Sequence, residues 1–246
     1  MKKITCLISI VTASMCMNAQ TNVNFKRLVS FDGTNGAKPF AGLIIGKDGN
    51  LYGTTVSGGV YNNGTIFKMS PNGTISTLFS FNGTNGFFPS SELVQGADGK
   101  LYGSTSHGGN GYDNLHSGGA GTIFKISTDG RDFTNLYFFG GMGEPVGGLV
   151  LATDGNFYGT TQWGGTGNVG TIFRISPEGD FKTLASLGIS FSCPDSGLVL
   201  GRDSNMYGTM AVGGKTGGSI FQTNHQWSSN NLGFFYSYEL LSHFTK

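Results

Sequence analysis

An eight-residue motif that returns along the chain constrains the fold more than any other feature. It reads Asp-Gly-Asn-Leu-Tyr-Gly-Thr-Thr at residues 48–55, and related copies stand at residues 98–105, 154–161 and 203–210. The spacings are 50, 56 and 49 residues, measured between Tyr52, Tyr102, Tyr158 and Tyr207. Periods of this length are typical of chains that stack copies of one supersecondary unit. The sequence therefore predicts a repeat array.

Each unit contains four short segments with strand character. In the first unit these are residues 42–46, 51–56, 64–70 and 75–81, called here the first to fourth strands. Asp-Gly between the first two supplies the positive φ that tight hairpins need. A proline precedes the first strand of every unit, at Pro39, Pro89, Pro145 and Pro194. No segment has a helical period, and Gly or Pro interrupts the chain at short intervals.

Four antiparallel strands in a repeat of about 50 residues predict an all-β fold, a β-propeller of about four blades. The short, glycine-bracketed first strand is expected innermost, near the axis. In the third strand Phe67 and Ile66 point to opposite faces, which suits blades stacked on both sides. Gly53 in the second strand is expected to let a neighbouring backbone approach. The alternatives are a β-solenoid, whose repeats are usually shorter, and an open or truncated propeller-like array.

The two ends of the repeat region suggest how a ring closes. Residues 25–31 look like a fourth strand without the three strands before it, and the last unit stops after its third strand at Phe221. Pairing of residues 25–31 beside residues 218–222 would complete the last blade and hide the open sheet edges. Residues 225–246 repeat nothing clearly. We interpret them as a degenerate strand or as foreign sequence after a truncation.

The N-terminus predicts export. Two lysines are followed by an apolar run at residues 4–11 and by small residues up to Ala19, the pattern of a signal peptide. The run is too short to span a bilayer as a helix, and the alternative is a buried N-terminal strand. The expected division is a signal peptide at 1–19, a repeat domain at 20–224 and a tail at 225–246. Cys193 is then the sole cysteine, which excludes an intramolecular disulfide. The expected location is periplasmic, cell-surface or extracellular.

Composition narrows the function classes. The net charge is +1, which argues against a nucleic-acid or anionic-membrane surface. The 43 glycines fit many tight turns in a protein that still has enough apolar residues for a core.

The motif set as a whole resembles a known family. Asp-Gly-Asn-Leu-Tyr-Gly-Thr-Thr, Gly-Gly, Gly-Thr-Ile-Phe-Lys and Leu-Phe-Ser-Phe-Asn-Gly are similar to the GloVer tandem-repeat family of bacterial secreted proteins, across residues 25–221. The resemblance implies an exported repeat protein without catalytic residues, often followed by a separate sorting or anchoring segment. The sequence departs from the pattern after Phe221, where no sorting domain is recognised.

Residues present in every unit are interpreted as structural, so binding candidates are residues that break the repeat. The tyrosine of each motif is expected to pack its ring and bond its hydroxyl, and the aspartate to shape the turn. The second-to-third and fourth-to-first loops vary and are expected on one face. The ligand-binding candidates there are Tyr61, His107, Tyr112 and Trp163, with Phe87 and Phe88 as further aromatic residues. Exposed aromatic residues suit sugar or peptide binding, although they can also simply cap the loops.

Neither a metal nor a cofactor is expected. His107, Asp113 and His116 share one loop, but their spacing fits no zinc pattern. Residues 32–36 and 82–86 resemble calcium loops with too few carboxylates.

No known catalytic motif occurs, so no catalytic residue is assigned. Glu92, Glu144 and Asp195 are the carboxylates that a glycosidase would use if two of them lay close together. Three hypotheses remain. The first is an exported, non-catalytic module that binds a glycan or a protein at the cell surface. The second is a polysaccharide-acting enzyme, and the third is a truncated piece of a longer repeat protein.

Overall fold

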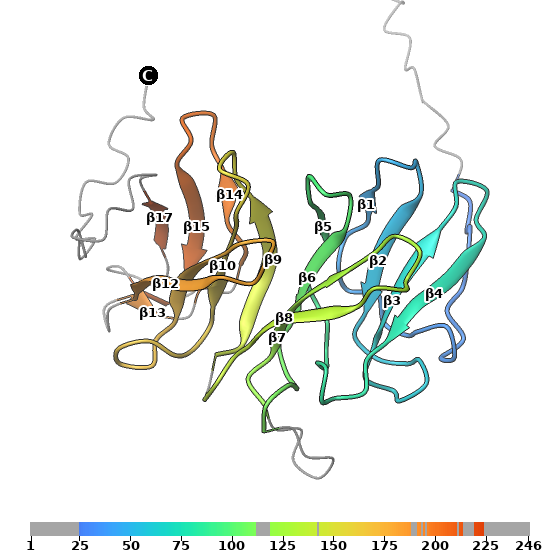
Figure 1. The fold of residues 1–246 in the computed structure, drawn as a ribbon, viewed down its shortest axis with the longest axis horizontal. Coiled ribbons are helices and arrows are strands. Elements are labelled where there is room, and N and C mark those ends of the chain that lie inside the picture. Colours follow the sequence, from blue (N-terminus) through green and yellow to red (C-terminus); the bar gives the residue numbers. More distant parts are fainter. Residues whose placement is uncertain are drawn as a thin grey trace, which may run out of the picture.

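The computed structural model describes residues 25–111, 119–141, 143–187, 191–192, 194, 196–210, 212–213 and 219–223. Every regular element within these ranges is a β-strand, and the strands form four main sheets that follow one another in chain order, together with one two-stranded sheet (Figure 1). The expected signal peptide at 1–19 and the tail at 225–246 lie outside the described residues. The predicted all-β, propeller-like repeat fold is confirmed.

Each sheet corresponds to one sequence unit. The first sheet contains β1 (Ile44–Ile45), β2 (Leu51–Thr55), β3 (Thr65–Met69) and β4 (Ile75–Ser80). The second contains β5 (Val94–Gln95), β6 (Leu101–Thr105), β7 (Thr122–Ile126) and β8 (Thr134–Phe138). The third contains β9 (Pro145–Leu151), β10 (Phe157–Thr161), β11 (Thr171–Ile175) and β12 (Phe181–Ser186). The fourth contains β14 (Val199–Leu200), β15 (Met206–Met210) and β17 (Ser219–Thr223), and a small ladder pairs β13 (Phe191–Ser192) with β16 (Val212–Gly213).

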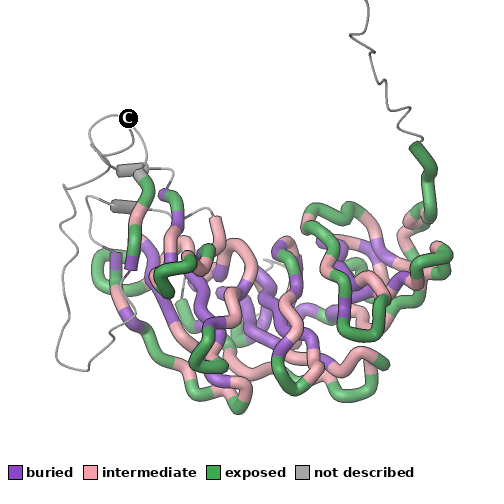
Figure 2. The backbone as a smooth tube through the Cα atoms, turned by 90° about the horizontal axis from the view of Figure 1, so that it is seen from above, coloured by how far each residue is buried: buried purple, intermediate pink, exposed green. Residues whose placement is uncertain are grey.

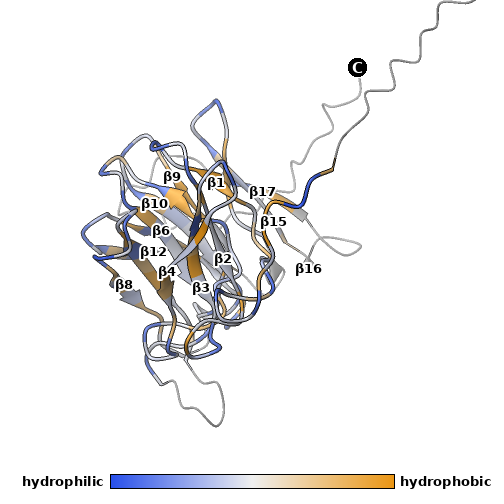
Figure 3. Ribbon diagram, turned by 90° about the vertical axis from the view of Figure 1, so that its right-hand side faces the viewer, coloured by the Kyte–Doolittle hydropathy of each residue, from blue (hydrophilic) through white to orange (hydrophobic). Residues whose placement is uncertain are grey.

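Within each sheet the strands are antiparallel and lie in chain order, with the first strand at one edge. The pairing register between equivalent strands is the same from sheet to sheet. The third and fourth strands shift register at the same point in three sheets, after Ile66, Ile123 and Ile172. Seen from above, the sheets form an open crescent (Figure 2), and hydrophilic residues concentrate in the loops and turns at the ends of the strands (Figure 3).

The glycine of the repeated motif has a different purpose from the predicted one. Gly53 pairs with Phe67 across β2 and β3, and a Cβ at Gly53 would lie 2.7 Å from the tip of the Phe67 ring and from Leu43 Cδ2. The expectation that a neighbouring backbone approaches Gly53 is therefore wrong. The missing side chain makes room for an aromatic ring of the adjacent strand, and the same Gly–Phe pairing recurs in the other three sheets.

The motif tyrosines behave as predicted. Tyr52, Tyr102 and Tyr158 are at most 2% exposed. Each hydroxyl donates a hydrogen bond to the aspartate four residues earlier, at 2.7, 2.9 and 2.8 Å for these three. The worn fourth copy keeps the bond, from Tyr207 to Asp203 at 2.6 Å. Ring packing and turn geometry are thus tied together in every unit.

An aromatic residue after two of the fourth strands, β4 and β8, joins neighbouring sheets. The Phe81 ring is fully buried and packs edge-on against Phe124 of β7 in the next sheet, with ring centroids 5.3 Å apart. Phe139 contacts Phe173 of β11 in the same way at 5.5 Å. Aromatic pairs of this geometry add about 0.5–1.5 kcal/mol beyond the area they bury. The sheets are therefore stacked by repeated side-chain contacts.

The predicted ring closure is not present. Residues 25–31 form no strand, and within the described residues β17 pairs with β15 alone. Phe31 packs instead against Phe67 of the first sheet, with ring centroids 5.1 Å apart. The first and fourth sheets stand at opposite ends of the crescent, so residues 25–31 and β17 do not meet (Figures 1 and 2).

Candidate ligand-binding face

The two variable sets of loops come together on one face, as predicted. We call this surface the loop face. It consists of the fourth-to-first connections, residues 32–43, 81–93 and 139–144, and the second-to-third connections, residues 56–64, 106–111 with 119–121, and 162–170. Backbone bridges join the two sets in each unit, between Ala37 and Ser57 and between Phe87 and His107. In the third unit Gln162 N donates to Glu144 O at 2.8 Å.

In the first three units, the residue before the proline that precedes the first strand has a left-handed backbone. Lys38, Phe88 and Glu144 have φ values of 57°, 61° and 40°. Positive φ is uncommon for residues other than glycine and costs about 1–3 kcal/mol unless the surroundings hold it. What holds it here is the hydrogen bond that each carbonyl accepts from the residue just after the second strand of the same unit. One strained backbone conformation is thus repeated, while its side chain changes from a cation to an aromatic ring to an anion.

His107 is the best-connected candidate. Its Nε2 lies 3.5 Å from Glu144 Oε1, and its Nδ1 lies 3.2 Å from Ser106 Oγ. The imidazole ring is 6.0 Å from each of the rings of Phe87 and Phe88, in edge-on contact. The His107 side chain is 38% exposed and that of Glu144 is 29% exposed, so both reach solvent. His107, Phe87, Phe88 and Glu144, called here the His107 group, join the loops of the second unit to the loop that precedes β9 in the third.

The other predicted binding residues do not join this group through any contact that the structure records. Tyr61 is 58% exposed in the first unit. Trp163 is half-buried in the third unit, where its carbonyl accepts a bond from Thr161 Oγ1 at 2.7 Å. Tyr112 lies outside the described residues. The loop face therefore presents Tyr61, the His107 group and Trp163 on successive units.

The loops that resemble calcium sites are closed by their own hydrogen bonds. Asp32 Oδ1 accepts bonds from Thr34 N, Thr34 Oγ1 and Asn35 N, at 2.9, 2.7 and 3.1 Å. These bonds hold the pKa of Asp32 below its usual value. Within the described residues no group of three His, Cys, Asp or Glu side chains is arranged to hold a metal, and Asp113 and His116 lie outside those residues.

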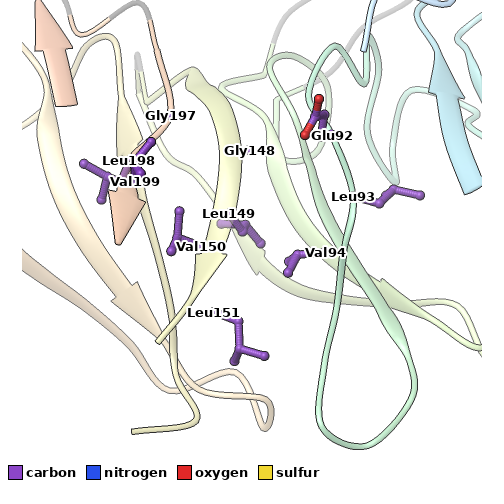
Figure 4. A pocket seen from close by; sticks show the side chains of 10 residues that line it. All are labelled: Glu92, Leu93, Val94, Gly148, Leu149, Val150, Leu151, Gly197, Leu198 and Val199. Carbon is purple, nitrogen blue, oxygen red and sulfur yellow. The ribbon is translucent and has the colours of Figure 1, made fainter. Parts of the chain in front are cut away.

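The inner strands line a hollow of about 520 Å³ on the concave side of the crescent. Its walls are residues 92–94, 148–151 and 197–199, so the first strands of three units are innermost, as predicted. Figure 4 shows aliphatic side chains from β5, β9 and β14, with the carboxylate of Glu92 lying apart from them. The hollow offers apolar contact and little polar chemistry.

The two carboxylates of the glycosidase hypothesis that the structure describes, Glu92 and Glu144, lie in different surroundings. Glu92 lines the hollow, where its side chain lies against Gly42. Glu144 does not line it, and its carboxylate faces His107. Asp195 lies outside the described residues.

Reasoning from the sequence missed two features of this face. Lys38 was not considered, and Glu144 was considered for catalysis and not as the partner of His107. A signal for both exists, because each residue directly precedes a proline that returns once per unit.

Together the stacked four-stranded sheets define a repeat-built, propeller-like protein whose ring is not closed. The profile described as the Gloeobacter/Verrucomicrobia repeat matches residues 15–142 and 111–243. The chain belongs to this repeat family. Within the described residues, no helix is long and apolar enough to cross a membrane.

Comparison with solved structures supports the fold. The chain is similar to a nidogen/laminin complex structure, with 18% identity and a TM-score of 0.51, over 71% of this chain and 57% of that one. It is also similar to a gluconolactonase from Xanthomonas campestris (16% identity, TM-score 0.49, 73% of this chain and 57% of that one) and to TolB from Acinetobacter baumannii (18%, 0.49, 76% and 40%). The chain thus spans little more than half the length of the first two. A search of curated proteins found no match.

Proposed function

We propose that the protein is an exported, non-catalytic module that binds a protein or a glycan outside the cell through its loop face. One observation carries the proposal. Lys38, Phe88 and Glu144 each precede the proline of their unit with a positive φ, and each carbonyl accepts the same kind of backbone bond, yet their side chains differ completely. Repeats that conserve only architecture need no such variation. A repeated backbone conformation that presents different side chains on one face is suited to binding a ligand.

The chemistry of the face supports binding over catalysis. Partly exposed aromatic rings contribute most to contact energy in interfaces, and Phe88 and Trp163 are of this kind. The motif aspartates and tyrosines are hydrogen-bonded to each other in all four units, and we interpret these pairs as structural. Export is inferred from the charged and apolar N-terminal pattern that ends at Ala19.

The test is a binding screen of the purified protein on glycan and peptide arrays, followed by variants against any ligand found. Phe88→Ala, His107→Ala and Trp163→Ala should each weaken binding by about tenfold, the effect of losing about 1.4 kcal/mol at a contact residue. Glu178→Ala is the matched control, because Glu178 is exposed on the opposite face, in the turn between β11 and β12.

The glycan and peptide arms of the array distinguish the two ligand classes. Arrays that stay blank at high protein concentration, or a ligand whose affinity falls with Glu178→Ala and not with the loop-face variants, would count against the proposal. Export is tested separately, by sequencing the N-terminus of the protein isolated from outside the cytoplasm. A mature N-terminus at Gln20 is expected, and an intact Met1 would refute cleavage.

A further inference from the structure

The two ends of the crescent lack complementary parts. The fourth sheet has three strands in the part of the chain that the structure describes, and β17 is hydrogen-bonded there along one edge, to β15. At the other end, residues 25–31 have no strand partner. An unpaired strand edge presents backbone donors and acceptors that can pair with another strand.

Residues 25–31 have the sequence of a fourth strand. Phe-Lys-Arg-Leu-Val-Ser-Phe aligns without a gap with Ile-Ser-Thr-Leu-Phe-Ser-Phe at residues 75–81, which includes β4. The alignment equates Leu28 with Leu78 and Phe31 with Phe81.

Residues 25–31 also have the position of a fourth strand. Phe31 packs on Phe67 at 5.1 Å, as Phe81 packs on Phe124 at 5.3 Å. A Cβ at Gly73 would lie 3.2 Å from Leu28 O, and the equivalent Cβ atoms at Gly130 and Gly179 would lie 2.8 and 3.2 Å from Leu78 O and Leu136 O. Residues 25–31 therefore occupy the place of the outer strand of a preceding sheet, and no other strand of such a sheet lies beside them among the described residues.

The same chain is poorly able to supply the missing sheet. Bringing β17 to residues 25–31 would require the three sheet-to-sheet interfaces to rotate together. Each interface is fixed by a specific contact: Thr54 Oγ1 donates to Ser91 O at 3.3 Å, the rings of Tyr102 and Phe157 stack at 4.1 Å, and Thr160 Oγ1 donates to Ser196 O at 3.1 Å. Packed interfaces of this kind resist continuous bending.

We propose that a second copy of the chain supplies it: residues 25–31 of one copy add to β17 of the other as its fourth strand. The contact is heterologous, head to tail, and two such contacts close a ring. Two copies then provide eight sheets, within the range of about four to eight blades that propellers adopt. Exposed apolar side chains at both ends, Leu28 at 50% and Ile220 at 49%, would be covered by the pairing.

The other sheets fix the register of the proposed pair. Ile66 faces Phe79 and Phe67 faces Thr77 between β3 and β4. Because Ile220 occupies the place of Ile66, and Val29 that of Phe79, Ile220 of one copy should face Val29 of the other. This register can be tested directly.

The first experiment measures molar mass by size-exclusion chromatography with light scattering on the full protein. We expect twice the monomer mass, with a shift to the monomer on dilution or with Val29→Pro, which removes a backbone donor from the added strand. Because residues 25–31 are not paired within the chain, the far-ultraviolet circular dichroism and melting temperature of the monomeric Val29→Pro protein should match those of wild-type diluted to monomer. A wild-type protein that stays monomeric at high concentration would overturn the proposal.

The second experiment uses cysteine pairs in a background whose native cysteines are replaced by serine. Mixing a Val29→Cys protein with an Ile220→Cys protein should give a disulfide-linked pair on mild oxidation. Val29→Cys mixed with Lys182→Cys should not cross-link. Lys182 is exposed on β12, whose sheet already has its fourth strand and so has no place for residues 25–31. If the Val29→Cys and Ile220→Cys proteins do not cross-link when mixed, while the double variant forms an intrachain disulfide, closure within one chain replaces the proposal.

Discussion

A single methyl group added at Gly103 should destabilise the protein far more than its size suggests. Gly103 lies in β6 and pairs with Phe124 across the ladder. A Cβ built there would lie 2.6 Å from the tip of the Phe124 ring and 2.8 Å from Leu93 Cδ2. Phe124 is fully buried and Leu93 is 3% exposed, so neither side chain can move into solvent. The φ angle of Gly103 is not in the left-handed region, so alanine fails here through crowding alone.

The expected cost of Gly103→Ala follows from this crowding. Extra carbon atoms in a well-packed core cost about 1–3 kcal/mol. For a domain of this size each kcal/mol corresponds to about 2–4 °C in melting temperature. Urea and thermal unfolding, followed by circular dichroism, measure both quantities. Gly140→Ala is the matched control, because nothing lies within 4 Å of a Cβ there and its φ is ordinary, so its effect should stay within about 0.5 kcal/mol.

A double-mutant cycle decides whether the ring is the cause. Phe124→Leu removes the ring edge that a Cβ at Gly103 would meet, so the combined variant should be more stable than the sum of the two single costs predicts. We expect a coupling of at least about 0.5 kcal/mol, as residues in contact show. If Gly103→Ala costs no more than Gly140→Ala, or if the cycle is additive, the explanation of the Gly–Phe pairing is wrong.

Three further predictions concern polar groups. Tyr158→Phe should lower the free energy of unfolding in urea by about 1–3 kcal/mol, because it removes the hydroxyl that donates to the Asp154 carboxylate. Tyr207→Phe should cost less, because the hydrogen bond between Tyr207 and Asp203 is exposed. Although partial burial opposes ionisation of Asp48, hydrogen bonds from Tyr52, Asn50 and Lys68 hold its pKa below the unfolded value of about 3.9. The stability that ionised Asp48 contributes is therefore full above about pH 4 and is lost as the pH falls further. Asp48→Asn should make the free energy of unfolding less dependent on pH in this acid range. His107→Gln should change the free energy of unfolding by less than about 1 kcal/mol, since the contact of His107 with Glu144 is partly exposed. A loss of ligand binding in this variant would therefore not reflect unfolding.

The fold was largely predictable because its determinants are local. The second strand was expected at residues 51–56 and is β2, Leu51–Thr55. Alternation of side chains and the Asp-Gly turn are enough to specify such a hairpin. The first strand was expected at residues 42–46 and is only Ile44–Ile45. The equivalent strand of the third unit, β9, runs from Pro145 to Leu151, so the length of the first strand differs between units whose local sequence patterns are similar.

Ring closure could not be predicted for a related reason. Residues 25–31 were expected to form a strand beside β17 of the same chain, but they form no strand and do not pair with β17. Which strands meet depends on the angle between successive sheets. That angle comes from contacts between units, such as Tyr102 on Phe157, and not from the content of any one unit.

The candidate site shows why repeats suit variable recognition. His107 could be singled out because it breaks the repeat, but its contact with Glu144 joins loops of different units and was invisible in the sequence. In each of the first three units, a carbonyl bond to the residue after the second strand holds the strained residue before the proline. The bond uses backbone atoms only, so it does not depend on which functional group the side chain at that position carries. A substitution at this position changes the side chain on the loop face and leaves the backbone unchanged. One fold can therefore present different side-chain chemistry in each successive unit.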